Sequence, residues 1–267
     1  MSDQSDADNP RASTFRRGLS SSALILGALA VVGASLLLPR ALHAIGMSPV
    51  AATSLTMITA ALLIRRYALA LSLYPPTFGV VAVGRDPIFV AAAVLGGGAL
   101  WLTAALIARL VVSDDRNVPA QASVDPYLFT LAFILVIAPV AEEILYRGLL
   151  QGSLNRVVPA GVSVLLTTLL FAGVHPRPRD MIAAAAIGFV AGVLRQVSGS
   201  MSPPIIAHMA MNTASGLVPS AAVARLAHSQ AVIPILLLLG GAIAVASVAM
   251  RLRALSILNG ARPGRKK

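Results

Sequence analysis

The sequence predicts an all-α protein, a polytopic membrane helix bundle of about eight transmembrane helices. Of its 267 residues, 57% are hydrophobic and only 12% are charged, and the mean hydropathy is +0.83. A soluble domain of this length would carry about 25% charged residues. Long apolar runs also alternate with proline-containing or charged breaks, which is the pattern of successive membrane spans.

Four regions follow one another along the chain. A polar stretch, expected to be a disordered tail, precedes N-terminal transmembrane helices, a helical core that carries the polar motifs, and a last transmembrane helix with a basic C-terminal tail. These regions cover residues 1–18, 19–120, 121–220 and 221–267. The predicted spans cover about 20–39, 49–73, 88–112, 127–154, 161–175, 180–197, 203–218 and 232–250. Helix-breaking residues such as Asp86-Pro87, Pro159 and Ser202-Pro203-Pro204 separate them.

The basic residues indicate a lipid surface rather than nucleic acid. The chain carries 21 Lys and Arg against 10 Asp and Glu, but they are scattered at the ends of apolar runs and only 4% of the chain is aromatic. This distribution is typical of anchoring to anionic lipid, so we expect no nucleic-acid partner. Most basic residues fall on one side if both termini are cytoplasmic, and the Arg- and Ala-rich composition favours a bacterial cytoplasmic membrane. The absence of cysteine excludes disulfides and a cysteine nucleophile.

Glu142 and Glu143 are the only glutamates of the chain, and both lie in the predicted span 127–154. An ionisable side chain at membrane depth is costly, so it is read as functional by default, with a partner nearby. On a helix, Glu143 and Arg147 are four residues apart and can pair, whereas Glu142 is rotated away by about 100°. Glu142 is then free to take or give a proton. Alternatively, the three residues only neutralise one another and stabilise the bundle.

Two further motifs place polar side chains in short predicted spans. Phe171 and His175 are four residues apart at the end of one span, and His208 and Asn212 share a face of another. A carboxylate and an imidazole can hold and deprotonate a water, while an imidazole and a carboxamide can donate to an oxyanion. With Glu142, these motifs supply that set without a serine or cysteine nucleophile. A single membrane histidine such as His175 is, however, more often a hydrogen-bonding residue near a helix end.

The ordered motifs Glu-Glu-x-x-x-Arg, Phe-x-x-x-His and His-x-x-x-Asn resemble the CPBP intramembrane proteases, also called the CaaX-protease and bacteriocin-processing (Abi) family. The resemblance covers about residues 125–218 and none of the first three spans. The roles that it implies are water activation for Glu142 and His175, oxyanion stabilisation for His208 and Asn212, and support for Glu143, Arg147 and Phe171.

The resemblance leaves open whether a metal takes part, because a metalloprotease and a glutamate-activated water are both argued for the family. Zinc favours two or three imidazole or thiolate ligands in an open tetrahedral site. Glu142, His175 and His208 could supply three ligands, so a divalent metal such as zinc is compatible with the sequence. The His-Glu-x-x-His signature of another class of membrane metalloprotease is absent.

These observations predict an intramembrane endopeptidase that cleaves a peptide or membrane-protein substrate within the lipid bilayer. A proton-coupled transporter with a buried Glu, Arg and His relay is the alternative, although no internal repeat favours it. A non-catalytic immunity or scaffold membrane protein that retains the site residues is a third hypothesis. The sequence names no substrate.

One geometric expectation is at odds with a shared site. At 1.5 Å per residue, Glu142 and His175 lie about 18 Å and 21 Å from the turn that joins their helices. His208 lies only about 8 Å into its span, so it falls roughly 15–18 Å short of the other two side chains. We therefore expect a broken or strongly tilted helix between residues 175 and 208.

Overall fold

The described part of the chain is entirely helical. The computed structural model describes residues 22–23, 25–27, 29–30, 33–34, 37–39, 41–70, 86–112 and 131–260, and these contain helices and turns but no strand. Three helices among them are long and apolar enough to cross a membrane: Pro87–Val111, Pro178–Ser198 and Val232–Ile257. The predicted all-α membrane class is confirmed, whereas the count of eight spans is not. The predicted tail at 1–18 lies outside the described residues.

The helix bounds lie close to the predicted spans, except that α11 continues to Gly260, ten residues beyond the predicted end at 250. The α-helices are α2 (Pro49–Ala70), α3 (Pro87–Val111), α5 (Ala138–Glu143), α6 (Gln151–Leu154), α7 (Ala160–Gly173), α8 (Pro178–Ser198), α9 (Ser202–Leu217), α10 (Ser220–Ala227) and α11 (Val232–Gly260). Two π-helical stretches, η2 (Phe133–Ile137) and η3 (Ile144–Leu150), join α5 and α6 into one continuous segment from 131 to 154. Only the short α10 has no predicted counterpart.

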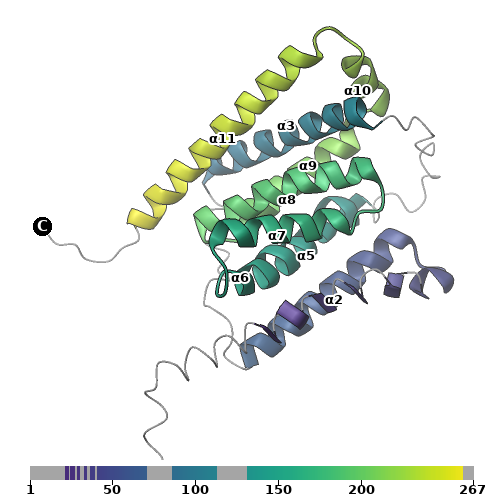
Figure 1. Ribbon diagram of the computed structural model, residues 1–267, viewed down its shortest axis with the longest axis vertical. Coiled ribbons are helices and arrows are strands. Elements are labelled where there is room, and N and C mark those ends of the chain that lie inside the picture. The colour runs from purple at the N-terminus through teal and green to yellow at the C-terminus, as the bar shows by residue number, and fades with distance from the viewer. Residues whose placement is uncertain are drawn as a thin grey trace, which may run out of the picture.

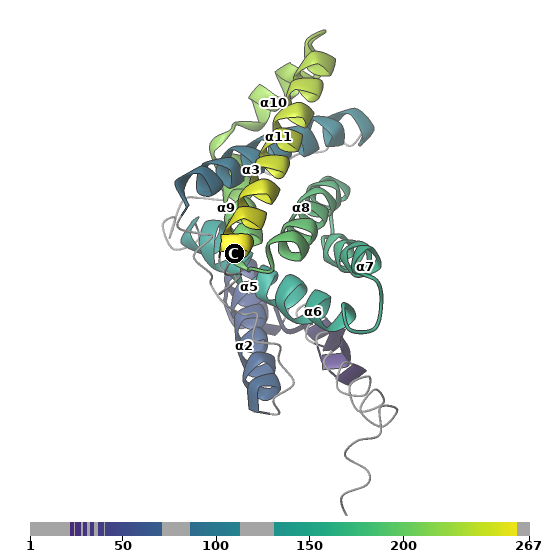
Figure 2. The ribbon, with the colours of Figure 1, turned by 90° about the vertical axis from the view of Figure 1, so that its left-hand side faces the viewer.

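A central group of helices is covered on two sides (Figure 1). It consists of the 131–154 segment with α7, α8 and α9, which contact one another. On one side, α3 packs against α8 and α9, and α11 runs along α3. On the other side, α2 packs against α5 and the two π-helical stretches, an arrangement that Figure 2 shows from the side. The polar motifs of the sequence all lie in the central group.

The helix breaks predicted from proline and aspartate have direct structural roles. Asp86 caps α3, because its Oδ1 accepts hydrogen bonds from the backbone N–H groups of Ile88 (3.0 Å) and Phe89 (3.3 Å), and Pro87 occupies the first turn. Gly199 ends α8 with φ of 65°, a left-handed conformation that glycine adopts without steric cost. These caps fix where α3 and α8 begin and end.

The close crossing of α3 and α9 depends on Gly97. A Cβ atom at this position would overlap the carbonyl oxygen of Ala207 and would lie 2.9 Å from Ala210 Cβ. The backbone of α3 therefore touches α9 directly beside His208. Small residues allow this kind of approach between membrane helices.

Candidate active site

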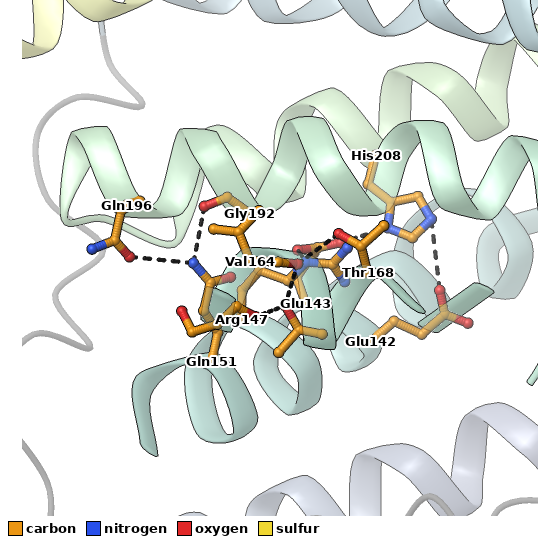
Figure 3. A network of polar contacts seen from close by, with 11 residues as sticks. Glu142, Glu143, Arg147, Gln151, Val164, Thr168, Gly192, Gln196 and His208 are labelled. Atoms are coloured by element: carbon orange, nitrogen blue, oxygen red, sulfur yellow. Dashed lines mark hydrogen bonds and ion pairs between the residues drawn. The ribbon is translucent and has the colours of Figure 1, made fainter. Parts of the chain in front are cut away.

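A buried chain of polar contacts joins α5, η3 and α9 (Figure 3). The His208 Nδ1–H group donates a hydrogen bond of 2.8 Å to Glu143 Oε1, and Arg147 Nε lies 3.3 Å from Glu143 Oε2. The side chains of Glu143 and Arg147 are 0% exposed and that of His208 is 5% exposed. The predicted Glu143–Arg147 pair is thus confirmed, and it holds His208 as well.

Glu142 approaches the same histidine from its other side. Its Oε2 atom lies 3.6 Å from His208 Nε2, and its side chain is 16% exposed. His208 is therefore flanked by two carboxylates, one buried and one accessible. The site thus contains a carboxylate that faces an imidazole and remains reachable from outside.

Phe171 lies between the two histidines. Its ring makes edge contacts with His175 (5.1 Å between centroids) and with His208 (5.7 Å). His175 Nδ1–H donates to the carbonyl oxygen of Phe171 at 2.8 Å, so a neutral His175 ring keeps its Nε2 lone pair available. The guanidinium of Arg147 stacks on the same phenyl ring, 4.7 Å from its centroid. Phe171 is thus the apolar support of the whole cluster.

Asn212 is held at the edge of this cluster. Its Nδ2 atom donates to the carbonyl oxygen of Ile134 in η2 at 2.9 Å, which ties α9 to the start of the 131–154 segment. Asn212 follows His208 by four residues, so both side chains lie on one face of α9. The second N–H of the carboxamide is not used by this bond and can donate elsewhere.

The Glu143–Arg147 pair continues in two further polar residues, Gln151 and Asn155, that the sequence motifs did not include. Glu143, Arg147 and Gln151 of the 131–154 segment and Asn155, which follows it, form a stripe spaced four residues apart, and this spacing is the signal that could have revealed the last two. Gln151 Nε2 donates to the carbonyl oxygen of Gly192 at 2.9 Å, and Asn155 Nδ2 donates to Gln196 Oε1 at 2.9 Å. The stripe therefore fixes the 131–154 segment against α8.

Two glycines let α8 approach this stripe. A Cβ atom at Gly188 would lie 3.3 Å from Arg147 Nη2, and one at Gly192 would lie 2.9 Å from Val164 Cγ1 and 3.4 Å from Gln151 Oε1. Arg147 Nη1 and Nη2 have no hydrogen-bond partner among the described residues. The buried charge of Arg147 thus depends on Glu143 and on the ring of Phe171.

Of the broken or strongly tilted helix expected between residues 175 and 208, the break is not found within α8, which is continuous from Pro178 to Ser198, and the tilt stays a prediction. His208 reaches Glu142 and Glu143 for two other reasons. The turn from α8 to α9 is itself mostly buried, with Ser200 0% and Met201 2% exposed, so α9 begins inside the molecule. In addition, η3 lies between Glu143 and the end of its segment, and wide π-helical turns rise less per residue than α-helical ones.

The donor groups do not form a complete metal site. A catalytic zinc is held by three protein ligands, whereas no group of three His, Cys, Asp or Glu side chains suited to a metal occurs among the described residues. Glu142 and His208 converge, but His175 does not complete a ligand set with them. We therefore derive no chemical step through a metal.

The comparisons with known proteins single out the same part of the chain. Residues 124–214 match the family model of Rce1-like proteins, described as type II CAAX prenyl endopeptidase Rce1-like. An uncharacterised 24.3 kDa protein of Escherichia coli is 28% identical over 99 residues, which cover 35% of this chain and 46% of that protein. The chain thus matches about half the length of this curated relative. No solved structure matches it.

Every motif residue from Glu142 to Asn212 falls inside the matched segment. The geometry had already joined these motifs around His208, on helices that belong to the central group. Over residues 124–214 the chain is therefore similar to the Rce1-like family of type II CAAX prenyl endopeptidases, and the resemblance predicted from its motifs is confirmed.

Proposed function

We propose that this protein is an intramembrane endopeptidase of the CAAX-protease type, in which Glu142 activates a water that attacks a peptide bond. The observation that carries the proposal is the contact of 3.6 Å between Glu142 Oε2 and His208 Nε2 in an otherwise buried cluster. A general base must lie within reach of a water and be positioned for transfer. Glu142 meets this requirement because it is partly exposed, unlike Glu143.

Four side chains have separate roles in the proposed reaction. Glu142 takes a proton from the water while the water oxygen bonds to the scissile carbonyl carbon, and the carbonyl becomes an oxyanion. His175 assists by accepting a hydrogen bond from the same water through Nε2. His208 Nε2–H and the spare N–H of Asn212 donate to the oxyanion. Glu142 then passes its proton to the leaving amine as the carbon–nitrogen bond breaks.

Glu143 fixes the protonation and orientation of the His208 ring in the proposed reaction. Because Glu143 Oε1 accepts the Nδ1–H bond, one proton of the ring is fixed on Nδ1, and a second proton on Nε2 makes the ring a charged donor. Arg147 in turn fixes the orientation of the Glu143 carboxylate. Glu143 and Arg147 are thus positioning residues, which act through His208 and do not touch the substrate.

The decisive experiment compares peptides released by cells that carry the wild-type protein with those that carry Glu142→Gln. Mass spectrometry of membrane and secreted peptides identifies fragments that depend on the carboxylate, and the purified protein is then assayed on them. Removal of a general base should slow cleavage by about 100- to 10,000-fold. His208→Ala should slow it as well, because it removes a donor to the oxyanion.

The matched control is His228→Ala. His228 is an exposed histidine of the α10 end whose Nδ1 is bonded to the carbonyl oxygen of Ala224 at 2.8 Å, so its loss should leave cleavage unchanged. If folded Glu142→Gln protein cleaves at the wild-type rate, the proposal is wrong. A protein that moves protons or solutes across liposomes and releases no fragments would be a transporter instead.

A further inference from the structure

A second site lies on the face of α8 that points away from the catalytic cluster. A groove with a cavity volume of about 280 Å³ is enclosed by α3, α8 and α11. Val190 and Val193 line it from α8, whereas Gly188 and Gly192 on the opposite face of α8 meet Arg147 and Gln151. The groove is thus separated from Glu142 and His208 by the thickness of one helix.

The groove opens toward the lipid and is almost wholly apolar. Two of its lining side chains, Phe189 and Val248, are 54% and 56% exposed, whereas Met250 and Ala254 of α11 form its buried floor. Its volume is at the small end of ligand pockets, which span about 300–1,000 Å³. A single slender hydrocarbon chain fits such a space better than a bulky ring system.

A cation is among the residues that line the groove. Arg251 of α11 lines it and is exposed, and it has no ion-pair partner among the described residues. The nearby carboxylate of Asp86 is already paired with Arg253. Asp86 also caps the N-terminus of α3, while Ser198 in the lining is the last residue of α8. The groove therefore reaches the start of α3 and the end of α8, and the end of a membrane-spanning helix is where it meets the headgroup layer.

We propose that this groove binds one acyl chain of an anionic phospholipid, whose phosphate is held by Arg251. The apolar lining, the opening toward lipid and the unpaired cation among the lining residues fit both parts of one such molecule. Juxtamembrane arginines attract anionic headgroups. The bound lipid would brace α11 against α3 and α8 at a site distinct from the catalytic cluster.

The test uses the full-length protein, delipidated in detergent and titrated with dioleoyl phosphatidylglycerol or dioleoyl phosphatidylcholine. Native mass spectrometry measures the fraction of protein that retains one lipid. The wild type should bind the anionic lipid about fivefold more tightly than the zwitterionic one, the value expected for one arginine near the membrane surface. Arg251→Gln should remove that preference, and Val248→Trp should weaken binding of both lipids by filling the groove.

Two matched controls separate the site from general effects. Val245→Trp, on the same helix and 70% exposed but outside the groove, and Arg225→Gln, an exposed arginine of α10, should both bind like the wild type. If Val248→Trp does not fold, Val193→Trp fills the groove from α8 instead. Each of these substitutions leaves Glu142 and His208 untouched.

Three results would overturn the proposal. The first is an anionic preference that survives Arg251→Gln, and the second is normal lipid binding by both filled variants. The third is full protection against thermal unfolding by glycerol 3-phosphate alone, because the proposal requires the acyl chain as well as the phosphate.

Discussion

The two ion pairs Glu143–Arg147 and Asp86–Arg253 place the same chemistry in opposite surroundings. Glu143 and Arg147 are one helical turn apart and 0% exposed, in the middle of the central group. Asp86 and Arg253 join the start of α3 to α11, and the arginine is 48% exposed. The first pair continues through His208 into the candidate active site, whereas the second lies at the rim of the lipid-facing groove.

The difference teaches that burial, rather than the presence of an ion pair, sets how much the fold depends on it. An exposed pair is screened by solvent and contributes little. A buried pair gains little as a pair, but removal of one partner leaves an uncompensated charge inside the protein. Replacing either member of the Glu143–Arg147 pair should therefore destabilise the protein strongly, whereas the same change in the Asp86–Arg253 pair should have little effect on stability.

Arg147→Met should produce the largest effect on stability. The substitution leaves Glu143 charged and buried, which costs about 3–5 kcal/mol of unfolding free energy. Arg253→Met, the matched change in the rim pair, should leave thermal unfolding nearly unchanged. The measurement is unfolding of the detergent-solubilised proteins followed by circular dichroism.

The double variant Glu143→Gln/Arg147→Met sharpens this result. It removes both charges and keeps a carbonyl oxygen to accept the His208 Nδ1–H bond, so most of the lost stability should return. Equal destabilisation by Arg147→Met and Arg253→Met would show that burial does not govern the two pairs.

Asn212→Ala tests the central group through catalysis instead of stability. Loss of one oxyanion donor typically slows a reaction by about 100- to 1,000-fold. Asn212→Asp keeps the size of the side chain but loses both the bond to the Ile134 carbonyl and the donor to the oxyanion, so it should be as slow as Asn212→Ala. Both variants should be slow in kcat on the fragments identified with Glu142→Gln, with KM little changed. A normal kcat in folded Asn212→Ala would remove this residue from the mechanism.

Gly97→Ala tests the contact that connects the two regions. The added Cβ would meet the Ala207 backbone and Ala210, and overpacking of this kind costs about 1–3 kcal/mol. Gly98→Ala is the control, because its Cβ would lie 4.0 Å from Ala214 Cβ, an ordinary contact. Thermal unfolding should distinguish the two variants, and a shift of α9 should also lower the cleavage rate of Gly97→Ala. Identical behaviour of both variants would contradict the close crossing.

The sequence was most informative where a contact is local. The spacing of Glu143 and Arg147 predicted their pair, and Asp86-Pro87 and Ser202-Pro203-Pro204 predicted helix starts, because these features depend on a few neighbouring residues. The meeting of His208 with both glutamates could not be derived by counting residues. It depends on the buried turn before α9 and on η3, and neither has a signature in periodicity.

Other features were missed because they involve segments far apart in the chain. The four-residue spacing of Gln151 and Asn155 behind Arg147 was visible, but their partners on α8 include a backbone carbonyl, which no side-chain pattern identifies. The groove between α3, α8 and α11 is equally invisible in the sequence, since it arises from how three largely apolar helices pack against one another. Long-range packing, rather than local propensity, fixed both features.

The smallest expected effect concerns the rim pair and its response to acid. The hydrogen bond from Arg253 lowers the pKa of the Asp86 carboxyl, against a smaller opposing effect of desolvation, and the N–H groups of Phe89 and Ile88 lower it further. A carboxyl with a lowered folded pKa stabilises the fold above its ordinary value of about 3.9, and this contribution is lost as the pH falls through the lower folded value. The wild type should therefore have a slightly higher melting temperature than Asp86→Asn at pH 7, and the two melting temperatures should converge as the pH approaches 3. A difference in melting temperature that stays constant over this range would show that the charge of Asp86 does not contribute to stability.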